Sequence, residues 1–294
     1  MARIVCIGEA MLELSRKGEG WGLGYGGDTL NTAIHLARAG HDVAYLTAIG
    51  SGPLSAELTS QWAAEGIDTS LVLTHPTRGT GLYAISTDDA GERSFSYWRD
   101  TSAAREMFVL DAVDEAMKNA EWTDLLVFSL ISLAILPPEG RKHLLGLASL
   151  VRANGGKVAF DGNYRPRLWA NAEEASAARD AAIACADVGL PTLEDEVVLS
   201  GESDVEAVAA HWANLGCTET IVKLGAQGCR LPDGTMLQPP EILQPVDTSG
   251  AGDAFNGGYL SARFNGASVE DAAIAGHRLA GWCVMRRGAI PARD

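Results

Sequence analysis

The chain has 294 residues, and 47% of them are hydrophobic, which is enough for a packed core and excludes a disordered chain. Its formal net charge of −15 argues against nucleic acid as a partner, because contact with the phosphate backbone needs a basic surface. The five cysteines are odd in number, scattered and never arranged as CxxC, which favours a reducing compartment over a disulfide framework.

The N-terminus enters an expected strand at once, with no signal peptide before it. The longest apolar stretch, residues 125–136, contains Ser129 and Ser132 and is too short to cross a bilayer. We therefore expect a cytoplasmic protein without a membrane partner, in which residues 1–294 form one α/β domain.

Short apolar runs alternate with Ala-rich amphipathic segments, which is the pattern of a parallel sheet covered by helices on both faces. The expected central strands are Ile4–Ile7, Val43–Ile49, Leu125–Ser129, Lys157–Phe160, Val188–Leu190 and Thr220–Leu224. The expected helices between them are Thr29–Ala39, Ser55–Glu65, Arg141–Ala153, Glu173–Cys185 and Val205–Leu215. Helix C-terminal caps are expected at Gly40, Gly66, Gly155 and Gly216.

Two segments depart from this alternation. Leu14–Gly27 is rich in glycine and aromatic residues, and Thr80–Arg99 alternates like a β-hairpin with turn residues at Asp88–Gly91. We expect both, at approximately 12–27 and 80–101, to form a small β-sheet lid outside the main sheet. Their exposed aromatic and leucine side chains predict a homo-oligomer formed through the lid.

Polar and glycine residues follow nearly every expected strand. Ligands in such folds bind at the carboxyl ends of the parallel strands, so these residues are expected to meet in one site. They are Gly26, Gly27 and Asp28 ahead of the helix with Asn31, then Tyr83, Tyr97 and Arg99, then Asp161, Asn163 and Arg165, then Lys223, Gly225 and Gly228.

The stretch Asp247–Phe255 reads DTSGAGDAF and precedes an expected helix at Ala254–Ala262. Its small residues Gly250, Ala251 and Gly252 let the backbone approach a ligand, and unpaired amides at a helix N-terminus favour an anion. Asp253 stands at the same turn, where a general base for a substrate hydroxyl is needed. A capped turn without chemistry is the alternative reading of these residues.

Other phosphate and metal motifs are absent from the sequence. It contains no Walker A motif, no GxGxxG after the first strand, and no HxxxH or HExxH spacing.

At this point the chain resembles the ribokinase-like (PfkB) family of sugar kinases. Gly26–Asn31, read as GGDTLN, is similar to the family's N-terminal sugar-binding signature, and Asp247–Asp253 is similar to its C-terminal signature. The resemblance implies a three-layer α/β sandwich with a mostly parallel sheet and a β-sheet lid. Further likeness, in GEAMLELS (8–15), GERSFSYWR (91–99), ISLAIL (131–136) and the run from Arg152 to Trp169, implies transfer of the γ-phosphoryl group of ATP to the 6-hydroxyl of 2-keto-3-deoxygluconate.

The resemblance also implies roles for single residues. Asp253 would be the catalytic base, with the amides of Gly250, Ala251 and Gly252 stabilising the transferring phosphoryl group. Asp247 would shape the same loop, in a region where many relatives hold a monovalent cation. The residues implied on the nucleotide side are Asn163, Lys223, Gly225 and Gly228, and those implied on the sugar side are Gly27, Asp28 and Asn31.

The proposed substrate carries a carboxylate, which calls for guanidinium groups because these give bidentate, charge-assisted hydrogen bonds. We expect Arg99 and Arg165 to bind it, with Tyr83 and Tyr97 as hydroxyl donors. On this expectation an Arg99→Ala substitution weakens an acid-sugar kinase and spares a neutral-sugar kinase.

The family often has an Asn-x-x-Glu motif that organises Mg²⁺ through waters. The matching stretch here, residues 191–196, reads PTLEDE, with Thr192 in place of the Asn and Asp195 in place of the Glu. Because Mg²⁺ accepts a carboxylate of either length through its water shell, Asp195 and Glu196 are the expected metal-binding residues.

Two other functions remain open from sequence. One is a kinase for fructose or another neutral sugar. The other is a sugar-acid-binding regulator without catalysis, against which the intact Gly250–Asp253 turn counts.

Overall fold

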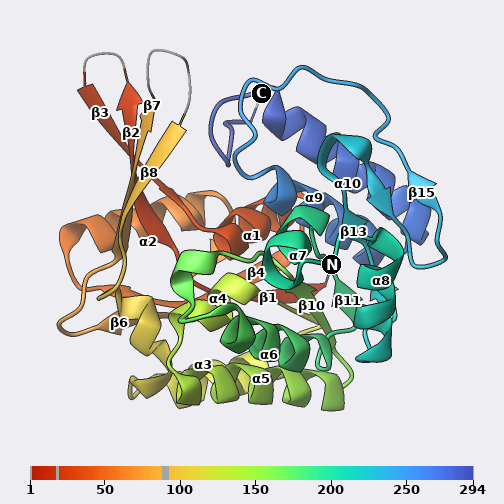
Figure 1. Cartoon of the computed structure of the whole chain (residues 1–294). Helices are drawn as coiled ribbons and strands as arrows, with labels where there is room; N and C mark the ends of the chain where they lie inside the picture. Colours follow the sequence, from red (N-terminus) through yellow and green to blue (C-terminus); the bar gives the residue numbers. More distant parts are fainter. Residues whose placement is uncertain (1, 18–19, 88–92, 294) are drawn as a thin grey trace.

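The computed structural model describes residues 2–17, 20–87 and 93–293. Its main element is a parallel sheet with the strand order β12-β11-β10-β9-β1-β4-β5, in which β6 also pairs with β4 (Figure 1). The strands are β1 (Arg3–Ile7), β4 (Asp42–Gly50), β5 (Ile67–Asp68), β6 (Val72–His75), β9 (Leu125–Ser129), β10 (Lys157–Asp161), β11 (Val188–Gly189) and β12 (Glu219–Thr220).

Helices cover both faces of this sheet, so the described chain forms three layers (Figure 1). One layer contains α1 (Asp28–Arg38), α2 (Pro53–Ala64), α9 (Ala251–Phe264) and α10 (Val269–Val284). The other contains α3 (Val113–Ala120), α4 (Leu130–Ile135), α5 (Pro138–Ala153), α6 (Ala172–Ile183), α7 (Leu193–Ser200) and α8 (Val205–Asn214), with the 3-10 turns η1 (Ala103–Val109) and η2 (Pro166–Leu168).

Each face of the sheet has its own apolar core, as the two-residue period of a strand requires. In β1 the side chains of Ile4 and Cys6 pack on the α1 and α9 side, while Val5 and Ile7 pack on the α5 side. All five residues of β9 are buried, which places that strand in the middle of the sheet. The sequence patterns that predicted parallel central strands are therefore confirmed.

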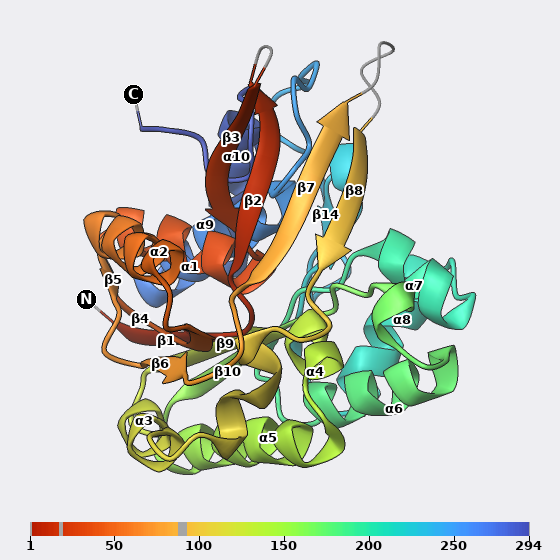
Figure 2. The ribbon, with the colours of Figure 1, turned by 90° about the vertical axis from the view of Figure 1, so that its left-hand side faces the viewer.

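A second, four-stranded sheet stands away from the three layers and is called the lid sheet (Figure 2). Its strand order is β3 (Gly20–Gly26), β2 (Met11–Lys17), β7 (Gly81–Thr87) and β8 (Arg93–Trp98). The predicted turn at Asp88–Gly91 lies outside the described residues, and the assignment of residues 1–294 to a single domain stays a prediction.

The strand register divides the lid sheet into two faces. Tyr97 pairs with Tyr83, and Tyr83 pairs with Glu13, so these three side chains share the inner lid face. The outer lid face carries mostly apolar side chains. The residues that pair across neighbouring strands on this face are Trp98↔Leu82, Leu82↔Leu12, Leu14↔Leu23 and Arg16↔Trp21. The inner lid face looks toward the three-layer body, because Tyr97 contributes to the cavity described below.

One expected strand is split in two. Thr220–Leu224 was expected to be a single central strand, but β12 ends at Thr220, and β13 (Val222–Lys223) joins a separate antiparallel sheet with β14 (Cys229–Arg230) and β15 (Met236–Leu237). The backbone nevertheless continues beside β11, because Ile221 N donates to Gly189 O and Lys223 N donates to Pro191 O, each at 2.8 Å, and Thr192 and Lys223 form a parallel bridge. The side chain of Ile221 stays buried in the same core, and β13 pairs with β14 on its other side. A run of apolar residues predicts burial but does not specify which neighbour a strand pairs with.

The expected helix ends agree with the structure. Gly40, Gly66, Gly155 and Gly216 all have φ between 90° and 106°, the left-handed region used just after helix C-termini. None of the helices in the described part of the chain is long and apolar enough to span a membrane.

Candidate active site

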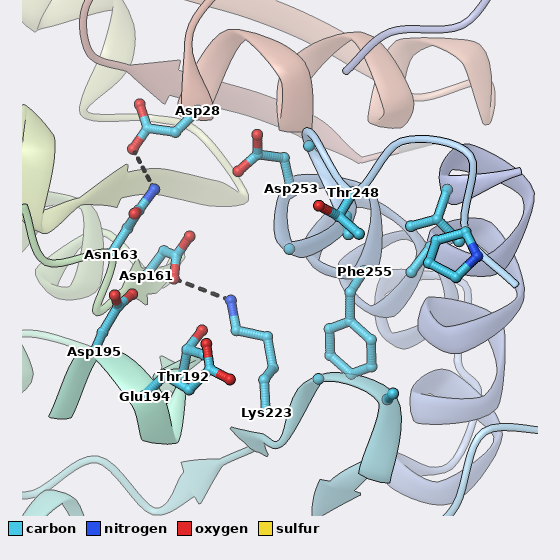
Figure 3. A pocket seen from close by; sticks show the side chains of 18 of the residues that line it. Asp28, Asp161, Asn163, Thr192, Glu194, Asp195, Lys223, Thr248, Asp253 and Phe255 are labelled. Atoms are coloured by element: carbon cyan, nitrogen blue, oxygen red, sulfur yellow. Dashed lines mark hydrogen bonds and ion pairs between the residues drawn. The ribbon is translucent and has the colours of Figure 1, made fainter. Parts of the chain in front are cut away.

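A cavity of about 1140 Å³ lies at the carboxyl ends of the central strands, between the lid sheet and the start of α9 (Figure 3). Most of the residues predicted from sequence line it: Gly27, Asp28, Tyr97, Arg99, Asn163, Arg165, Asp195, Lys223, Gly225, Gly228, Gly250, Ala251, Gly252 and Asp253. Strands that are distant in sequence thus deliver their end residues to one place, as the parallel topology predicts.

The first turn of α9 forms one wall. Gly250 caps the helix with φ of 70°, and a Cβ atom there would lie 2.6 Å from Cβ of Ala289, so only glycine fits. The N–H groups in the first turn of a helix have no partner within the helix and carry its positive dipole end. This wall can therefore hold an anionic group such as a phosphate.

Asp253 lies within this first turn and is 9% exposed. Its Oδ2 accepts a hydrogen bond of 2.7 Å from Nδ2 of Asn31 in α1, and Oγ1 of Thr32 donates to its backbone oxygen at 3.3 Å. Asn31 itself does not line the cavity. It acts on the site by holding the Asp253 carboxylate in one orientation.

Burial, and after it the nearby carboxylate of Asp28, raise the pKa of Asp253 to about 8. The hydrogen bond from Asn31 and the charge of Lys223 work in the opposite direction. A carboxyl group with a pKa near the working pH is suited to accept a proton from a hydroxyl.

Asp28 begins α1 and faces Asn163, whose Nδ2 donates to Asp28 Oδ2 at 3.3 Å (Figure 3). Burial raises the pKa of Asp28 as well, and a hydrogen bond from Ser129 lowers it. Gly27, just before, has φ of 152°, and a Cβ there would lie 2.4 Å from the backbone oxygen of Glu9. The chain can make this turn only with glycine.

A buried cation faces these carboxylates. Nζ of Lys223 lies 3.1 Å from Asp161 Oδ1 and 3.1 Å from Asn256 Oδ1, and Asn256 Nδ2 donates to Asp161 Oδ2 at 2.9 Å. Lys223 is 7% exposed and points from β13 toward the start of α9 (Figure 3). Sequence reasoning identified Lys223 but did not single out Asp161 and Asn256 as its partners, which come from β10 and α9.

Three arginines enter the opposite end of the cavity, near the lid sheet. Arg99 donates from Nε and Nη2 to Oε2 of the buried Glu9, with 2.8 Å for the Nε bond. Arg165 donates from Nη1 to Asp195 Oδ1 at 3.1 Å. Sequence reasoning missed the third, Arg167 in η2, whose guanidinium carbon lies 4.3 Å from the centre of the Tyr97 ring.

Tyr83 differs from the expectation. It was expected to donate to a substrate, but its hydroxyl donates to Oε2 of Glu13, and the residue is 8% exposed. Its ring stacks on Tyr97 with centroids 6.0 Å apart. Tyr83 therefore supports Tyr97 from behind, and only Tyr97 reaches the cavity.

Asp247 also lies behind the cavity wall. Its Oδ1 accepts from the Ser249 amide at 3.0 Å and its Oδ2 accepts from the Gly288 amide at 2.6 Å. The carboxylate joins the loop before α9 to the segment after α10. This geometry gives Asp247 a loop-positioning role, and direct nucleotide contact is not part of it.

The start of α7 presents Thr192, Glu194 and Asp195 to the cavity (Figure 3). Burial raises the pKa of Asp195, and the charge of Arg165 lowers it. Mg²⁺ in kinases is commonly held by one or two carboxylates together with substrate phosphates and waters. Glu194 and Asp195, opposite the first turn of α9, fit such an ion in ligand type.

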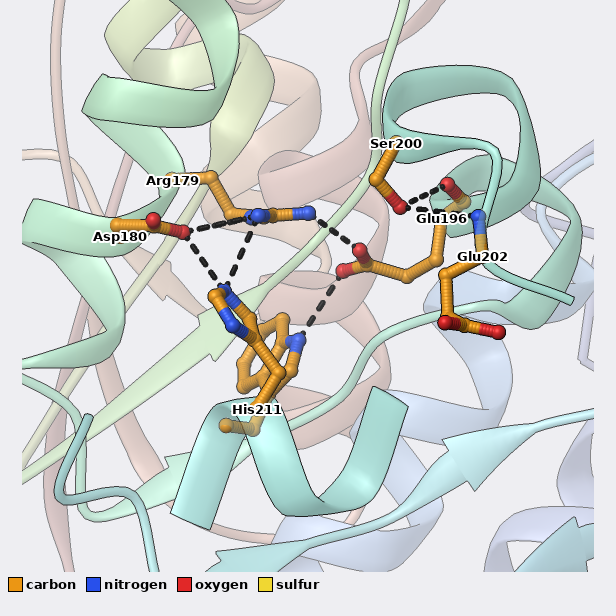
Figure 4. Close-up of polar contacts among 7 residues, drawn as sticks. Arg179, Asp180, Glu196, Ser200, Glu202 and His211 are labelled. Atoms are coloured by element: carbon orange, nitrogen blue, oxygen red, sulfur yellow. Dashed lines mark hydrogen bonds and ion pairs between the residues drawn. The ribbon is translucent and has the colours of Figure 1, made fainter. Parts of the chain in front are cut away.

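The expected role of Glu196 in metal binding is corrected by the structure. Its side chain points away from the cavity, where its Oε2 accepts from Arg179 Nη1 at 2.5 Å and its Oε1 accepts from Trp212 Nε1 at 3.0 Å (Figure 4). Arg179 and Trp212 hold Glu196 in this orientation, whereas Asp195 lines the cavity, so the two carboxylates do not face the same ligand. Arg179 is also bound by Asp180, which lies 3.0 Å from His211 Nε2.

The end of the cavity beyond Lys223 is largely apolar and is formed by residues of the 238–246 segment and of α10. Pro239, Pro240 and Leu243 line it together with His277, whose ring contacts Phe255 edge-on at 5.0 Å. Burial lowers the pKa of His277, so its ring is neutral at pH 7. A flat apolar group such as a nucleotide base suits this end.

Arg179 is predicted to be essential for stability through Glu196. An Arg179→Met substitution leaves the Glu196 carboxylate, which is 3% exposed, without its cation and should reduce the free energy of unfolding by about 3–5 kcal/mol. The measurement is urea unfolding followed by circular dichroism.

The matched control is Arg152→Met, which removes an exposed arginine 3.5 Å from Asp187 and should change stability by less than about 1 kcal/mol. Adding Glu196→Gln to Arg179→Met should recover much of the lost stability, because no buried charge then remains unpaired. Equal effects of Arg179→Met and Arg152→Met would contradict this account.

Comparisons with known proteins show the family of this chain. The model of the pfkB family of carbohydrate kinases matches residues 1–294. The 2-dehydro-3-deoxygluconokinase of Escherichia coli strain K12 is 43% identical, with 99% of this chain and 98% of that protein covered.

Solved structures show the same fold. The PfkB protein from Polaromonas sp. JS666 superposes with a TM-score of 0.83 at 31% identity, over 96% of this chain and 95% of that chain. A putative ribokinase II from E. coli, solved in complex with ATP and Mg²⁺, superposes with a TM-score of 0.84 at 21% identity, over 99% and 95%. The predicted ribokinase-like sandwich is therefore confirmed, and this chain belongs to the pfkB family of carbohydrate kinases.

Proposed function

We propose that this kinase transfers the γ-phosphoryl group of ATP to the 6-hydroxyl of 2-keto-3-deoxygluconate, yielding the 6-phosphate and ADP. The observation that carries the proposal is the position of Asp253. Its buried carboxylate lies between a wall of helix N-terminal amides and an end of the cavity lined by three arginines. The 43% identity to a protein named for phosphorylating this sugar acid supports the substrate.

In this reaction Asp253 takes the proton from the 6-hydroxyl of the sugar acid. The oxygen of that hydroxyl attacks the γ-phosphorus, and the bond between the γ-phosphorus and the bridging oxygen of the β-phosphate breaks, which releases ADP. The amides of Gly250, Ala251 and Gly252 stabilise the negative charge on the transferring group. Lys223 is placed to add positive charge, because its Nζ lies 3.7 Å from where a Cβ of Gly252 would be.

We assign the nucleotide to the cavity end near α10, with Gly225 and Gly228 beside its phosphates. The ribokinase II neighbour has the same fold and was solved with ATP and Mg²⁺, which supports ATP and Mg²⁺ as ligands. Glu194 and Asp195 would hold Mg²⁺ through waters, and the ion would offset charge on the β- and γ-phosphates.

A monovalent cation is a further proposal for the loop that Asp247 holds. Backbone oxygens of Ser249, Gly288 and Ala289 gather beside this loop, where they accept from the Sγ of Cys283 at 3.8, 4.0 and 3.5 Å. Converging carbonyl oxygens are ligands for hard cations, and such an ion would fix the backbone that leads into Gly250.

The alternatives receive less support. A kinase for a neutral sugar has no need of three arginines at the sugar end of its site. A regulator without catalysis has no need of a buried carboxylate with a raised pKa at an anion-binding turn.

A substrate panel tests the proposal. We expect ADP release with ATP and Mg²⁺ in the presence of 2-keto-3-deoxygluconate, and far less with gluconate, fructose or ribose. Asp253→Asn should lower kcat by about 100- to 10,000-fold, because it removes the base but keeps the shape. Turnover on fructose or ribose in preference to the keto acid would overturn the substrate. Tight sugar-acid binding without any turnover would favour the regulator.

The raised pKa of Asp253 predicts a pH dependence. Because the base must be ionised, kcat/KM for the sugar acid should rise with pH and level off above about pH 8. Asp28→Asn removes the neighbouring carboxylate that raises this pKa, so the rise should move to lower pH. The measurement is kcat/KM from pH 6 to 9.5 at saturating ATP. A rise that stays at the same pH in the variant would show that Asp28 does not tune Asp253.

We also propose that two copies associate through the outer lid face, on which Trp21, Leu23 and Trp98 are 50%, 43% and 59% exposed. Exposed apolar patches of this kind mark interaction sites, and pairing of two copies would cover them.

Trp98→Asp should therefore shift the protein toward the monomer in analytical ultracentrifugation, because a charge cannot be buried in that contact without a partner. Trp122→Asp is the matched control, since Trp122 is 67% exposed and lies outside the lid sheet. A monomeric unmutated protein, or an oligomer that only the Trp122 variant disrupts, would refute this association.

A further inference from the structure

The three arginines at the lid end of the cavity differ in whether their charge is already balanced. Arg99 is 7% exposed and pairs through two nitrogens with Glu9, which is 1% exposed. This pair is electrically neutral as a unit and is fixed by burial. The Arg99→Ala substitution expected from sequence therefore does not test carboxylate binding alone, because it also leaves the Glu9 carboxylate buried and unpaired.

Arg165 is balanced as well. Its Nη1 donates to Asp195 Oδ1 and to the backbone oxygen of Tyr164, at 3.1 and 2.7 Å. Because Asp195 also belongs to the proposed Mg²⁺ face, part of the charge of Arg165 is directed to that side of the cavity.

Arg167 forms no ion pair with any carboxylate in the part of the chain that the structure describes. Its guanidinium rests instead on the face of Tyr97, 4.3 Å from the ring centre, and it lines the same cavity. A cation over an aromatic face keeps its net charge and its outward N–H groups available to an anion. Arg167 belongs to η2, which follows β10 after four residues, whereas Tyr97 belongs to β8 of the lid sheet.

We propose that Arg167 is the residue that selects a carboxylate over a neutral sugar in this enzyme. The inference rests on the proposed function and deepens it. An incoming carboxylate gains less charge compensation from a guanidinium that is already paired with a carboxylate, as Arg99 and Arg165 are, than from one that is not. Because Arg167 belongs to η2 and contacts Tyr97 of the lid sheet, the carboxylate also binds where the lid meets the body of the protein.

The test compares two sugars of the same carbon chain: 2-keto-3-deoxygluconate and 3-deoxyfructose, in which a CH₂OH group replaces the carboxylate. Arg167→Met keeps an unbranched stem over Tyr97 and removes the charge. We expect kcat/KM for the acid to fall about 10- to 100-fold, as for loss of a charge-assisted hydrogen bond. We expect kcat/KM for the neutral sugar to change by less than about threefold, with the KM for ATP unchanged. Arg167→Lys should retain part of the preference for the acid.

Arg152→Met, on the surface of α5, is the control for removing a positive charge from the protein as a whole, and melting temperatures check folding. Equal losses on both sugars, or no change on either, would overturn the assignment of Arg167 while leaving the proposed function in place. An unmutated enzyme that does not prefer the acid would instead overturn the proposed function, and the inference with it.

Discussion

The structure depends on how one group of carboxylates is kept buried at the start of α9. Asp253, Asp28 and Asp161 face the same cavity, with Lys223 as the buried cation among them. Burial of several like charges is costly, and here the cost is reduced by specific hydrogen bonds from Asn31 and Asn163. These contacts join segments more than a hundred residues apart, so the three layers and the site are fixed together.

The same physics governs the two buried ion pairs outside this group. Glu9–Arg99 ties the end of β1 to the lid sheet, and Glu196–Arg179 ties α7 to α6. Neither pair is expected to add much net stability compared with apolar residues, but each strongly penalises the loss of one partner. Both pairs fix the orientation of the elements that they join. The first positions the lid above the cavity, and the second turns α7 so that Asp195 faces the phosphate side.

The sequence predicted the parallel sheet, the helix ends and the Gly250–Asp253 turn, because these follow from local periodicity and from positions that only glycine can occupy. It did not predict which of Asp195 and Glu196 faces the ligand, because that depends on Arg179 and on Trp212 in other helices. The balance of charge at Arg99 was also not predictable, since Glu9 lies 90 positions earlier in the chain. Local patterns indicate which residues gather at a site, whereas tertiary partners decide which of them remain free to bind.

Asp253, the base of the reaction, also affects the stability of the fold. The folded-state pKa of Asp253, about 8, lies above the ordinary value of 3.8, so between these values the folded protein retains a proton that the unfolded chain releases. The contribution of this group to stability is therefore fully present below the ordinary pKa and is lost as the pH rises through about 8. The ionised form needed for proton transfer is thus the one that burial and the neighbouring Asp28 disfavour. The hydrogen bond from Asn31 and the charge of Lys223 act against this, because both favour the carboxylate of Asp253. Asn31 joins α1 to α9 through Asp253, and Lys223 joins β13 to α9 through Asn256, so the contacts that adjust the acidity of the base are also contacts that pack the site together.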